Sequence, residues 1–155
     1  MSILLYALIV IGTFWFMEFT AWFTHKYVMH GFLWSWHADH HDPDLRHGFF
    51  EKNDLFFLVF AVPSATFYIL GSAVDGLFPL FFVGIGISVY GLAYFLVHDV
   101  YIHRRFNWFK QLDGTYSRAI LRAHGAHHAT KGQYGAESFG MLVVARKFFR
   151  KRTAE

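Results

Sequence analysis

Three long apolar segments, residues 3–23, 55–74 and 77–97, constrain the fold of this 155-residue chain more than any other feature. A hydrocarbon core about 30 Å thick is crossed by roughly 20 helical residues, and each segment reaches that length. Only Asp75 and Gly76 separate the second segment from the third, which predicts a helical hairpin. We therefore expect a single all-α domain, residues 1–155, that crosses a membrane with three helices.

The ends of the chain add two expectations. The first apolar segment lacks a basic leading region and a small-residue cleavage site, so we interpret it as a retained span and not as a signal peptide. A fourth apolar stretch, Ser138–Phe149, is too short to span and predicts an interfacial helix or a short wedge. The number of transmembrane helices would be four only if this stretch entered the membrane.

All fourteen Lys and Arg residues lie on one side of the predicted spans. Three of them, Lys26, Arg46 and Lys52, fall between the first and second spans, and the other eleven follow the third. By the positive-inside rule, residues 24–54 and 98–155 are cytoplasmic and the amino terminus is outside. The basic carboxyl-terminal tail can also bind anionic lipid.

Ten of the eleven histidines form two copies of one pattern, in which an HX4H motif precedes an HX2HH motif. Neutral imidazole is the commonest protein ligand for transition metals, so ten clustered rings can fill the coordination shells of two ions. The chain has no cysteine, which excludes thiolate sites and leaves N or O ligands. All four motifs fall on the predicted cytoplasmic side, which joins them into one site. The candidate metal ligands are His25, His30, His37, His40, His41, His98, His103, His124, His127 and His128.

On an α-helix the two motifs present their histidines differently. Residues i, i+3 and i+4 of HX2HH share one face, so each such helix can direct three rings into one cavity. The two histidines of HX4H point about 140° apart at 3.6 residues per turn, so that helix is expected to contact two metals, or one metal and its neighbour's edge. The HX4H helices should continue the first and third spans. Together the four segments predict a cytoplasmic helical cap with a histidine-rich di-metal site at the membrane boundary.

Other kinds of histidine site lack their sequence signals in this chain. No HEXXH motif supports a zincin protease, and no Glu-x-x-His supports the carboxylate-bridged di-iron site of ferritin-like bundles. No glycine-rich nucleotide loop is present, so reducing equivalents must come from a partner. A metal transporter would place its ligands near the bilayer midplane, whereas these motifs lie just outside the spans. These points favour a di-metal oxygenase.

The motifs HKYVMHG, HADHH, HDVYIH and HGAHH resemble the four histidine boxes of bacterial carotene hydroxylases. This group, the beta-carotene 3-hydroxylases, lies within the fatty acid hydroxylase and sterol desaturase superfamily. The resemblance covers most of the chain and includes Met17-Glu18, residues 48–54, residues 91–95 and Ser138-Phe139-Gly140. The boxes specify the superfamily, and the flanking stretches favour the carotene branch. His47 lies outside the boxes and is expected to be a surface residue.

The resemblance implies an integral, multi-pass di-iron monooxygenase of the bacterial inner membrane that hydroxylates carbon 3 of the beta-ionone rings of beta-carotene. The products would be beta-cryptoxanthin and zeaxanthin, with O2 as co-substrate and ferredoxin as electron donor. The cofactor would be two iron ions, and zinc can replace them in isolated protein because the same ligands bind zinc at least as well. No nucleic-acid partner is expected. A carotenoid 4-ketolase, another lipid or sterol hydroxylase and a non-catalytic membrane metal-binding protein stay open as alternatives.

Two carboxylates are candidates for orienting the ligand histidines, which usually donate their second ring N–H to a carboxylate or carbonyl. Asp99 adjoins His98 at the end of a span, and it is the strongest of the five acidic residues near the motifs, which are Asp39, Asp42, Glu51, Asp54 and Asp99. Glu18 is the other candidate, because an ionisable residue inside a span is costly and this one lies about two turns before His25.

A carotene has no hydrogen-bonding group, so its recognition must rest on shape and apolar contact. A subset of the aromatic side chains near the motifs is expected to line a hydrophobic tunnel from the bilayer to the metals. The others should face lipid or the membrane interface. The aromatic residues concerned are Phe14, Trp15, Phe16, Phe19, Trp22, Phe23, Trp34, Trp36, Tyr90, Tyr94 and Phe95.

Overall fold

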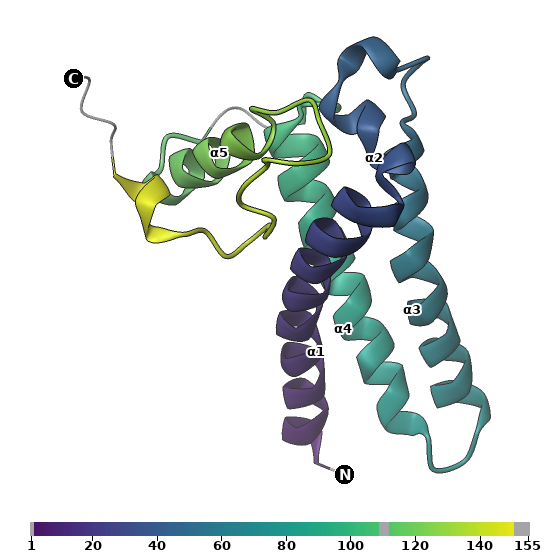
Figure 1. Cartoon of the computed structure of the whole chain (residues 1–155). Coiled ribbons are helices and arrows are strands. Elements are labelled where there is room, and N and C mark those ends of the chain that lie inside the picture. Colours follow the sequence, from purple (N-terminus) through teal and green to yellow (C-terminus); the bar gives the residue numbers. More distant parts are fainter. Residues whose placement is uncertain (1, 109–111, 151–155) are drawn as a thin grey trace.

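The computed structural model describes residues 2–108 and 112–150, and within these ranges it contains helices and loops but no strand. Residues 109–111 and 151–155, which belong to the predicted cytoplasmic region 98–155, lie outside the described residues. Figure 1 shows three long helices side by side with shorter helices gathered at one end. The long helices are α1 (Ile3–Phe23), α3 (Phe56–Ala73) and α4 (Phe78–Phe95).

The predicted all-α fold with three long apolar helices is confirmed. Each long helix, taken with the helical turns that continue it, is long and apolar enough to cross a membrane, and the combined ranges are Ile3–Phe32, Lys52–Ala73 and Phe78–Ile102. Large apolar side chains cover their outer surfaces, as at Ile3 (87% exposed) and Phe57 (72% exposed). Such surfaces are stable in lipid and not in water, so the chain is a membrane protein.

Small residues allow the three helices to approach closely. A Cβ added at Gly71 of α3 would lie 2.4 Å from the backbone N of Phe81 in α4, and one at Gly86 of α4 would lie 2.5 Å from Cβ of Thr13 in α1. The predicted hairpin between α3 and α4 turns at Asp75-Gly76, where Gly76 has φ +82°, a conformation that favours glycine. The core between the helices is formed by Met17, Ala21, Ile87 and Tyr90.

Apart from the turn between α3 and α4, the segments outside the long helices form a cap at the end opposite the amino terminus (Figure 1). The cap contains two π-helices that continue the spans, η1 (Thr24–Phe32) after α1 and η4 (Leu96–Ile102) after α4. It also contains α2 (Trp34–His41), α5 (Thr115–His127) and three short 3-10 turns, η2 (Pro43–Leu45), η3 (Lys52–Leu55) and η5 (Arg146–Phe149). Gly31, with φ −109° and ψ −127°, has a non-helical conformation inside η1 and bends the chain there, shortly before α2.

The prediction of an interfacial helix over Ser138–Phe149 is wrong. Only Arg146–Phe149 forms a 3-10 turn, and residues 138–145 are a non-helical segment that begins with Ser138 at φ 64°. The physical reason is that the backbone N–H groups of residues 141–143 donate to the Glu18 carboxylate, so they are not available for helical hydrogen bonds. The number of long apolar helices in the described residues is therefore three and not four.

Candidate metal centre

The HX4H motifs lie in the π-helices and not in α-helices. In a π-helix residue i bonds to residue i+5, so residues five apart lie one above the other, whereas in an α-helix they diverge. The backbone N–H of His103 donates to the carbonyl of His98 (2.9 Å), which closes one such turn over the whole motif. The π geometry therefore directs both histidines of each HX4H motif to the same side of their helix.

The ten candidate ligands meet in the cap, and nine of them form two groups whose nitrogen atoms lie within 4.8 Å of one another. The five-histidine group consists of His25, His30, His37, His41 and His127. The four-histidine group consists of His40, His98, His103 and His124. The two groups are neighbours, because the ring centroids of His37 and His40 are 5.2 Å apart.

The tenth ring, His128, lies between the groups. Its centroid is 4.4 Å from His41 of the five-histidine group and 4.6 Å from His124 of the four-histidine group. Its Nε2 atom is buried and has no hydrogen-bond partner among the described residues. His47 is exposed and belongs to neither group.

The two kinds of motif distribute their histidines between the groups in the opposite way to the expected one. Each HX4H motif supplies one group, since His25 and His30 enter the first and His98 and His103 the second. Each HX2HH motif is divided between the groups instead. In α2, His37 and His41 enter the five-histidine group and His40 the four-histidine group, and in α5, His124 and His127 enter different groups. For the HX4H motifs the reason is the π-helical turn, which removes the 140° divergence that an α-helix would give.

In seven of the ten rings Nδ1 faces an oxygen at 2.7 to 3.3 Å. Backbone carbonyls of one loop, residues 129–139, accept from His41, His30, His127 and His25; the acceptors are Thr130, Gln133, Glu137 and Phe139 in that order. Side chains accept from the other three rings, with Asn53 bound to His37, Glu51 to His40 and Asp99 to His98. Because these oxygens only accept, the proton of each neutral ring resides on Nδ1 and the lone pair on Nε2.

The Nε2 atoms then converge without protons between them. The Nε2–Nε2 distance is 3.1 Å for His25 and His37, 3.0 Å for His41 and His127, and 3.1 Å for His40 and His98. Two lone pairs at this distance repel unless a cation lies between them. Two nitrogens bound to one ion at about 2.1 Å and at right angles lie roughly 3.0 Å apart, which fits the observed spacing. The donor set, all imidazole, suits iron, zinc or copper.

Burial keeps the cap rings neutral and ready to bind a cation. Desolvation lowers the pKa of His41 to about 4 and that of His128 to about 3. It also lowers the pKa of His40 and His124 well below the usual range, and neighbouring histidines lower both further. A ring that stays neutral at pH 7 offers its Nε2 lone pair to a metal.

The two groups differ in the charge of their Nδ1 partners. In the four-histidine group His40 donates to Glu51 (2.7 Å) and His98 to Asp99 (3.3 Å). These carboxylates are held by arginines, with Glu51 3.1 Å from Arg46 and Asp99 2.9 Å from Arg105. In the five-histidine group every acceptor is a neutral carbonyl or amide oxygen.

Glu18 forms no hydrogen bond with a histidine ring among the described residues. Its hydrogen-bond partners in the described part of the chain are the Tyr90 hydroxyl and the backbone N–H groups of residues 141–143. Two sets of partners that meet the rings, Asn53 and the carbonyls of residues 129–139, have no recognisable signal in the sequence. A loop's carbonyls are present whatever its side chains, so only the folded chain reveals them.

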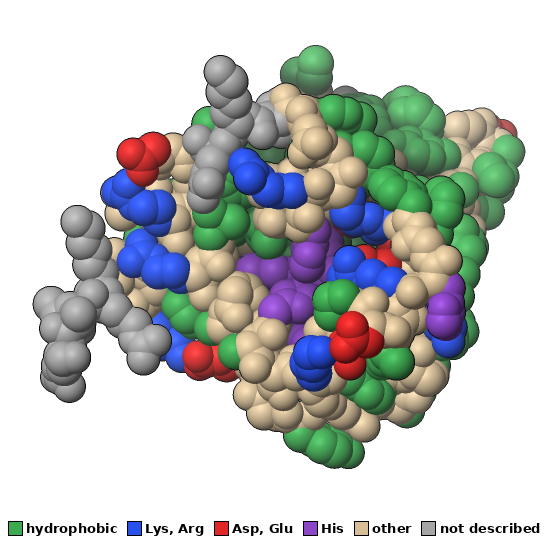
Figure 2. Space-filling model, turned by 90° about the horizontal axis from the view of Figure 1, so that it is seen from above, with side chains coloured by type: hydrophobic (Ala, Val, Ile, Leu, Met, Phe, Trp, Pro, Cys, Tyr) green, Lys and Arg blue, Asp and Glu red, His purple; other side chains and the backbone are tan. Residues whose placement is uncertain are grey.

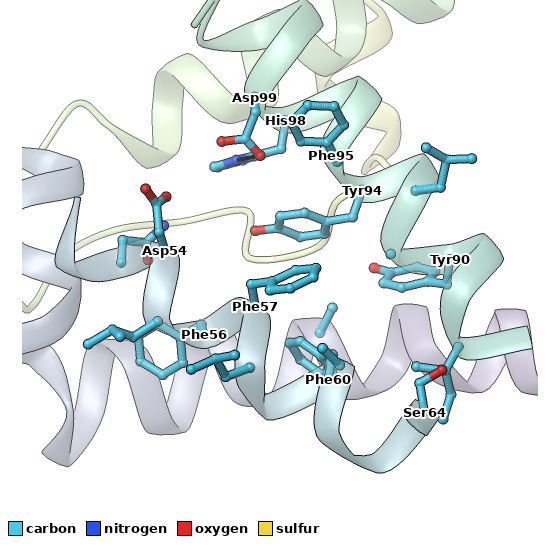
Figure 3. Close-up of a pocket in the computed structure, with 18 of the residues that line it drawn as sticks. Asp54, Phe56, Phe57, Phe60, Ser64, Tyr90, Tyr94, Phe95, His98 and Asp99 are labelled. Atoms are coloured by element: carbon cyan, nitrogen blue, oxygen red, sulfur yellow. Dashed lines mark hydrogen bonds and ion pairs between the residues drawn. The ribbon is translucent and has the colours of Figure 1, made fainter. Parts of the chain in front are cut away.

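A cavity of about 1010 Å³ leads from between the long helices to the histidines. Its lining includes one ring from each group, His25 and His98. Figure 3 shows His98 and Asp99 at one end, with Tyr94 and Phe57 beside them and Phe60, Tyr90 and Ser64 farther along. The residues between the histidine end and Ser64 are mostly aromatic, so this passage excludes water from the cluster on the membrane side.

Only part of the aromatic prediction coincides with this lining. Tyr90, Tyr94 and Phe95 of α4 do line the cavity. The predicted aromatics of α1 do not, and Trp15, Phe16 and Phe19 are more than half exposed on the outer surface. The cavity uses α3 instead, through Phe56, Phe57 and Phe60. Apolar composition alone does not distinguish a lipid-facing side of a span from an inward one.

The sequence profile of the family described as fatty acid hydroxylase matches residues 10–149. The chain belongs to this family. The beta-carotene hydroxylase of Pseudescherichia vulneris is 46% identical over 143 residues, which cover 91% of this chain and 77% of the relative. That of Pantoea ananas is 45% identical over 138 residues, covering 89% and 77%. The chloroplastic beta-carotene 3-hydroxylase of Gentiana lutea is 40% identical over 149 residues, covering 88% and 46%.

These relatives confirm the resemblance to bacterial beta-carotene hydroxylases that the histidine motifs indicate. No solved structure matches the chain.

Proposed function

We propose that this protein hydroxylates carbon 3 of the beta-ionone rings of beta-carotene, giving beta-cryptoxanthin and then zeaxanthin. The names of the relatives support the substrate and the reaction. Each hydroxylation would consume O2, two electrons and two protons, insert one oxygen atom into the C–H bond and release the other as water. The proposal assigns the electrons to ferredoxin.

The observation that carries the proposal is the cavity that ends at both histidine groups. Ligand sites are typically concave, mostly apolar and lined by a few polar groups, and this one opens among helices that face lipid. A hydrocarbon dissolved in the bilayer would enter it without crossing water. His25 and His98 at its inner end would bring a ring carbon close to both metal positions.

The residues present fit a pair of iron ions. We assign one ion to the five-histidine group and one to the four-histidine group, with His128 adjacent to both. Iron at these positions would supply the activation of O2 that oxidation of an unactivated C–H bond requires. The chain itself orients the rings through their Nδ1 partners, keeps the proton on Nδ1 and excludes water from the reacting end through Phe57, Phe60 and Tyr94.

The proposed orientation places the cap in the cytoplasm of a bacterial cell, with the spans in the inner membrane. All fourteen Lys and Arg residues belong to the cap side of the sequence, which the positive-inside rule assigns to the cytoplasm. Seen from the cap, part of the histidine cluster is visible between its segments, and Lys and Arg side chains lie around it (Figure 2). These positive charges favour an electron donor with an acidic surface, such as a ferredoxin, on this side.

Expression in a host that accumulates beta-carotene, followed by chromatography of the pigments, tests the proposal. We expect beta-cryptoxanthin and zeaxanthin. Echinenone or canthaxanthin would show a 4-ketolase instead, and unchanged beta-carotene beside intact protein would contradict both. Isolated protein should hold two metal ions, and activity should follow iron and not zinc. Full activity of a zinc-only preparation would contradict the redox mechanism.

A further inference from the structure

Glu18 is a buried carboxylate inside a membrane span, and in the described chain it forms no hydrogen bond with any of the candidate ligand rings. It lies on α1, is 5% exposed, and all its hydrogen bonds are accepted ones. Its Oε2 accepts from the Tyr90 hydroxyl of α4 at 2.8 Å. An acidic residue at such a position is costly and is retained where it has a specific task. The remaining partners of Glu18 indicate that task.

A single oxygen of Glu18 holds three consecutive backbone amides. Oε1 accepts from the N–H groups of Met141 (3.0 Å), Leu142 (2.8 Å) and Val143 (2.9 Å). These residues belong to the non-helical segment that crosses from the cap to the side of α1. Hydrogen bonds to a charged or acidic group are about twice as strong as neutral ones, and here three of them meet at one atom. Glu18 therefore fixes the position of the chain at residues 141–143.

The fixed segment follows directly after the loop that orients the five-histidine group. Residues 129–139 provide carbonyl acceptors for four of the five rings, at 2.9 Å for His30 and His41, 3.0 Å for His25 and 3.2 Å for His127. The loop begins at the end of α5 and ends two residues before the first amide that Glu18 holds. Its two ends are thus anchored by α5 and by Glu18.

The four-histidine group does not depend on the loop of residues 129–139 in this way. Its rings His40 and His98 donate to Glu51 and Asp99, which lie on other segments and are held by Arg46 and Arg105. In the described chain none of its Nδ1 acceptors comes from residues 129–139. Displacement of the loop of residues 129–139 would thus disturb the five-histidine group and leave the four-histidine group unchanged.

We propose that Glu18 is a positioning residue for the five-histidine group, acting through the amides of residues 141–143 and the carbonyls of the loop before them. This inference rests on the proposed two-metal centre and adds that the two metals respond differently to a change at one residue in α1. Metal retention tests it without reference to pigment.

The test compares metal content and chelator-driven metal release in four proteins, measured in detergent with iron or zinc loaded. Glu18→Gln keeps one acceptor oxygen and should release one of its two metals at least about tenfold faster than wild type, because partners that orient ligands change metal affinity by about 10- to 100-fold. Glu18→Leu removes both oxygens and should be isolated with about one metal. Thr20→Val is the control on the same helix, since among the described residues the Thr20 hydroxyl bonds only to the carbonyl of Phe16, and it should match wild type.

Double variants identify which metal is lost. Glu18→Leu combined with His25→Ala should still hold about one metal, because both changes affect the five-histidine group. Glu18→Leu combined with His124→Ala should hold almost none, because the second change removes a ligand of the other group. The reverse pattern would overturn the inference.

Release of both metals from Glu18→Gln at the wild-type rate would also overturn the inference, and this conservative variant decides the matter if Glu18→Leu fails to fold. Equal acceleration of both metals would overturn it as well, since it would indicate a general loss of structure. A wild type that holds fewer than two metals would overturn the proposed centre together with the inference. A wild type that holds two metals and forms no zeaxanthin would contradict the proposed substrate alone.

Discussion

Seven of the ten candidate ligand histidines use their two ring nitrogens for different tasks. Their Nδ1 donates to an oxygen of the chain and their Nε2 turns toward the other rings, as in His41 with Thr130 on one side and His127 on the other. This arrangement fixes the tautomer before any metal binds. It also makes the individual ring hard to replace, because Asn or Gln reproduces neither the length nor the two opposed nitrogens.

Substitution of a single histidine should therefore separate ligands from the one outside the motifs. We expect His41→Ala to abolish hydroxylation and lower the bound metal, because it removes an Nε2 atom 3.0 Å from that of His127. His128→Ala should do the same, since its ring is stacked on His41 with centroids 4.4 Å apart. His47→Ala is the control, and the exposed position of His47 predicts nearly unchanged metal and product. Retention of two metals and normal zeaxanthin by His41→Ala and His128→Ala would contradict the shared centre.

At the scale of elements, the π-helices explain why the HX4H spacing works. The two histidines of η1 are five positions apart, with four residues between them, and the π turn returns the chain to the same face after five positions. An α-helical turn would do so after four. A spacing of four positions in an α-helix would therefore also place both histidines on one face, whereas a spacing of six positions would not.

Changes in the length of η1 test this explanation. Deletion of Val28, which is half-buried and is not a candidate ligand, would leave the histidines four apart, as an α-helix requires. Insertion of one alanine after Val28 would place them six apart and rotate one ring away from the five-histidine group. We expect the deletion to retain more metal than the insertion, measured as metal per protein. Equal retention in both variants would show that the π turn has no part in ligand placement.

The long helices could be predicted from the sequence and the π turns could not. Hydropathy marks a span because a run such as Ile3–Phe23 is mostly apolar over its whole length, and the predicted limits of that helix coincide with the observed ones. The choice between i→i+4 and i→i+5 hydrogen bonds leaves the apolar pattern unchanged, so the sequence does not reveal the π-helix that contains His25 and His30. The non-helical conformation of residues 138–145 is hidden for a related reason. Its amides bind a carboxylate 123 to 125 residues earlier in the chain, which no local pattern records.

At the scale of the whole molecule, the cavity joins the lipid-facing stem to the cap. Gly91 of α4 lines this cavity and has no atom within 4 Å of the position that a Cβ would occupy. Gly91→Leu should therefore narrow the passage without displacing its neighbours, and we expect at least about tenfold less zeaxanthin with both metals retained. Gly12→Leu on α1 is the matched control, because Gly12 is equally unobstructed and lies outside the cavity. Equal product from the two variants would show that substrate does not use this cavity.

The buried histidine cluster also predicts how the metal-free protein responds to acid. Desolvation holds the pKa of His41 at about 4 and that of His128 at about 3, below the usual 6.5 of the unfolded chain. Between these values the unfolded chain binds more protons than the folded one, so the free energy of unfolding falls as pH drops below about 6.5. We expect the melting temperature of metal-free protein in detergent to decrease from pH 7 to pH 5. A constant or rising melting temperature would contradict neutral, buried rings.

The loop of residues 129–139 has a consequence for how this site tolerates mutation over evolutionary time. Its contribution to His25, His30, His41 and His127 is made by peptide oxygens, which every amino acid carries. Alanine scanning of the loop would leave these oxygens in place and would report little about their importance. Drift in the identity of these residues is compatible with an intact centre, whereas gain or loss of a single residue would shift all four acceptors relative to their rings. The metal centre therefore depends on the number of residues in this loop and not on their amino-acid types.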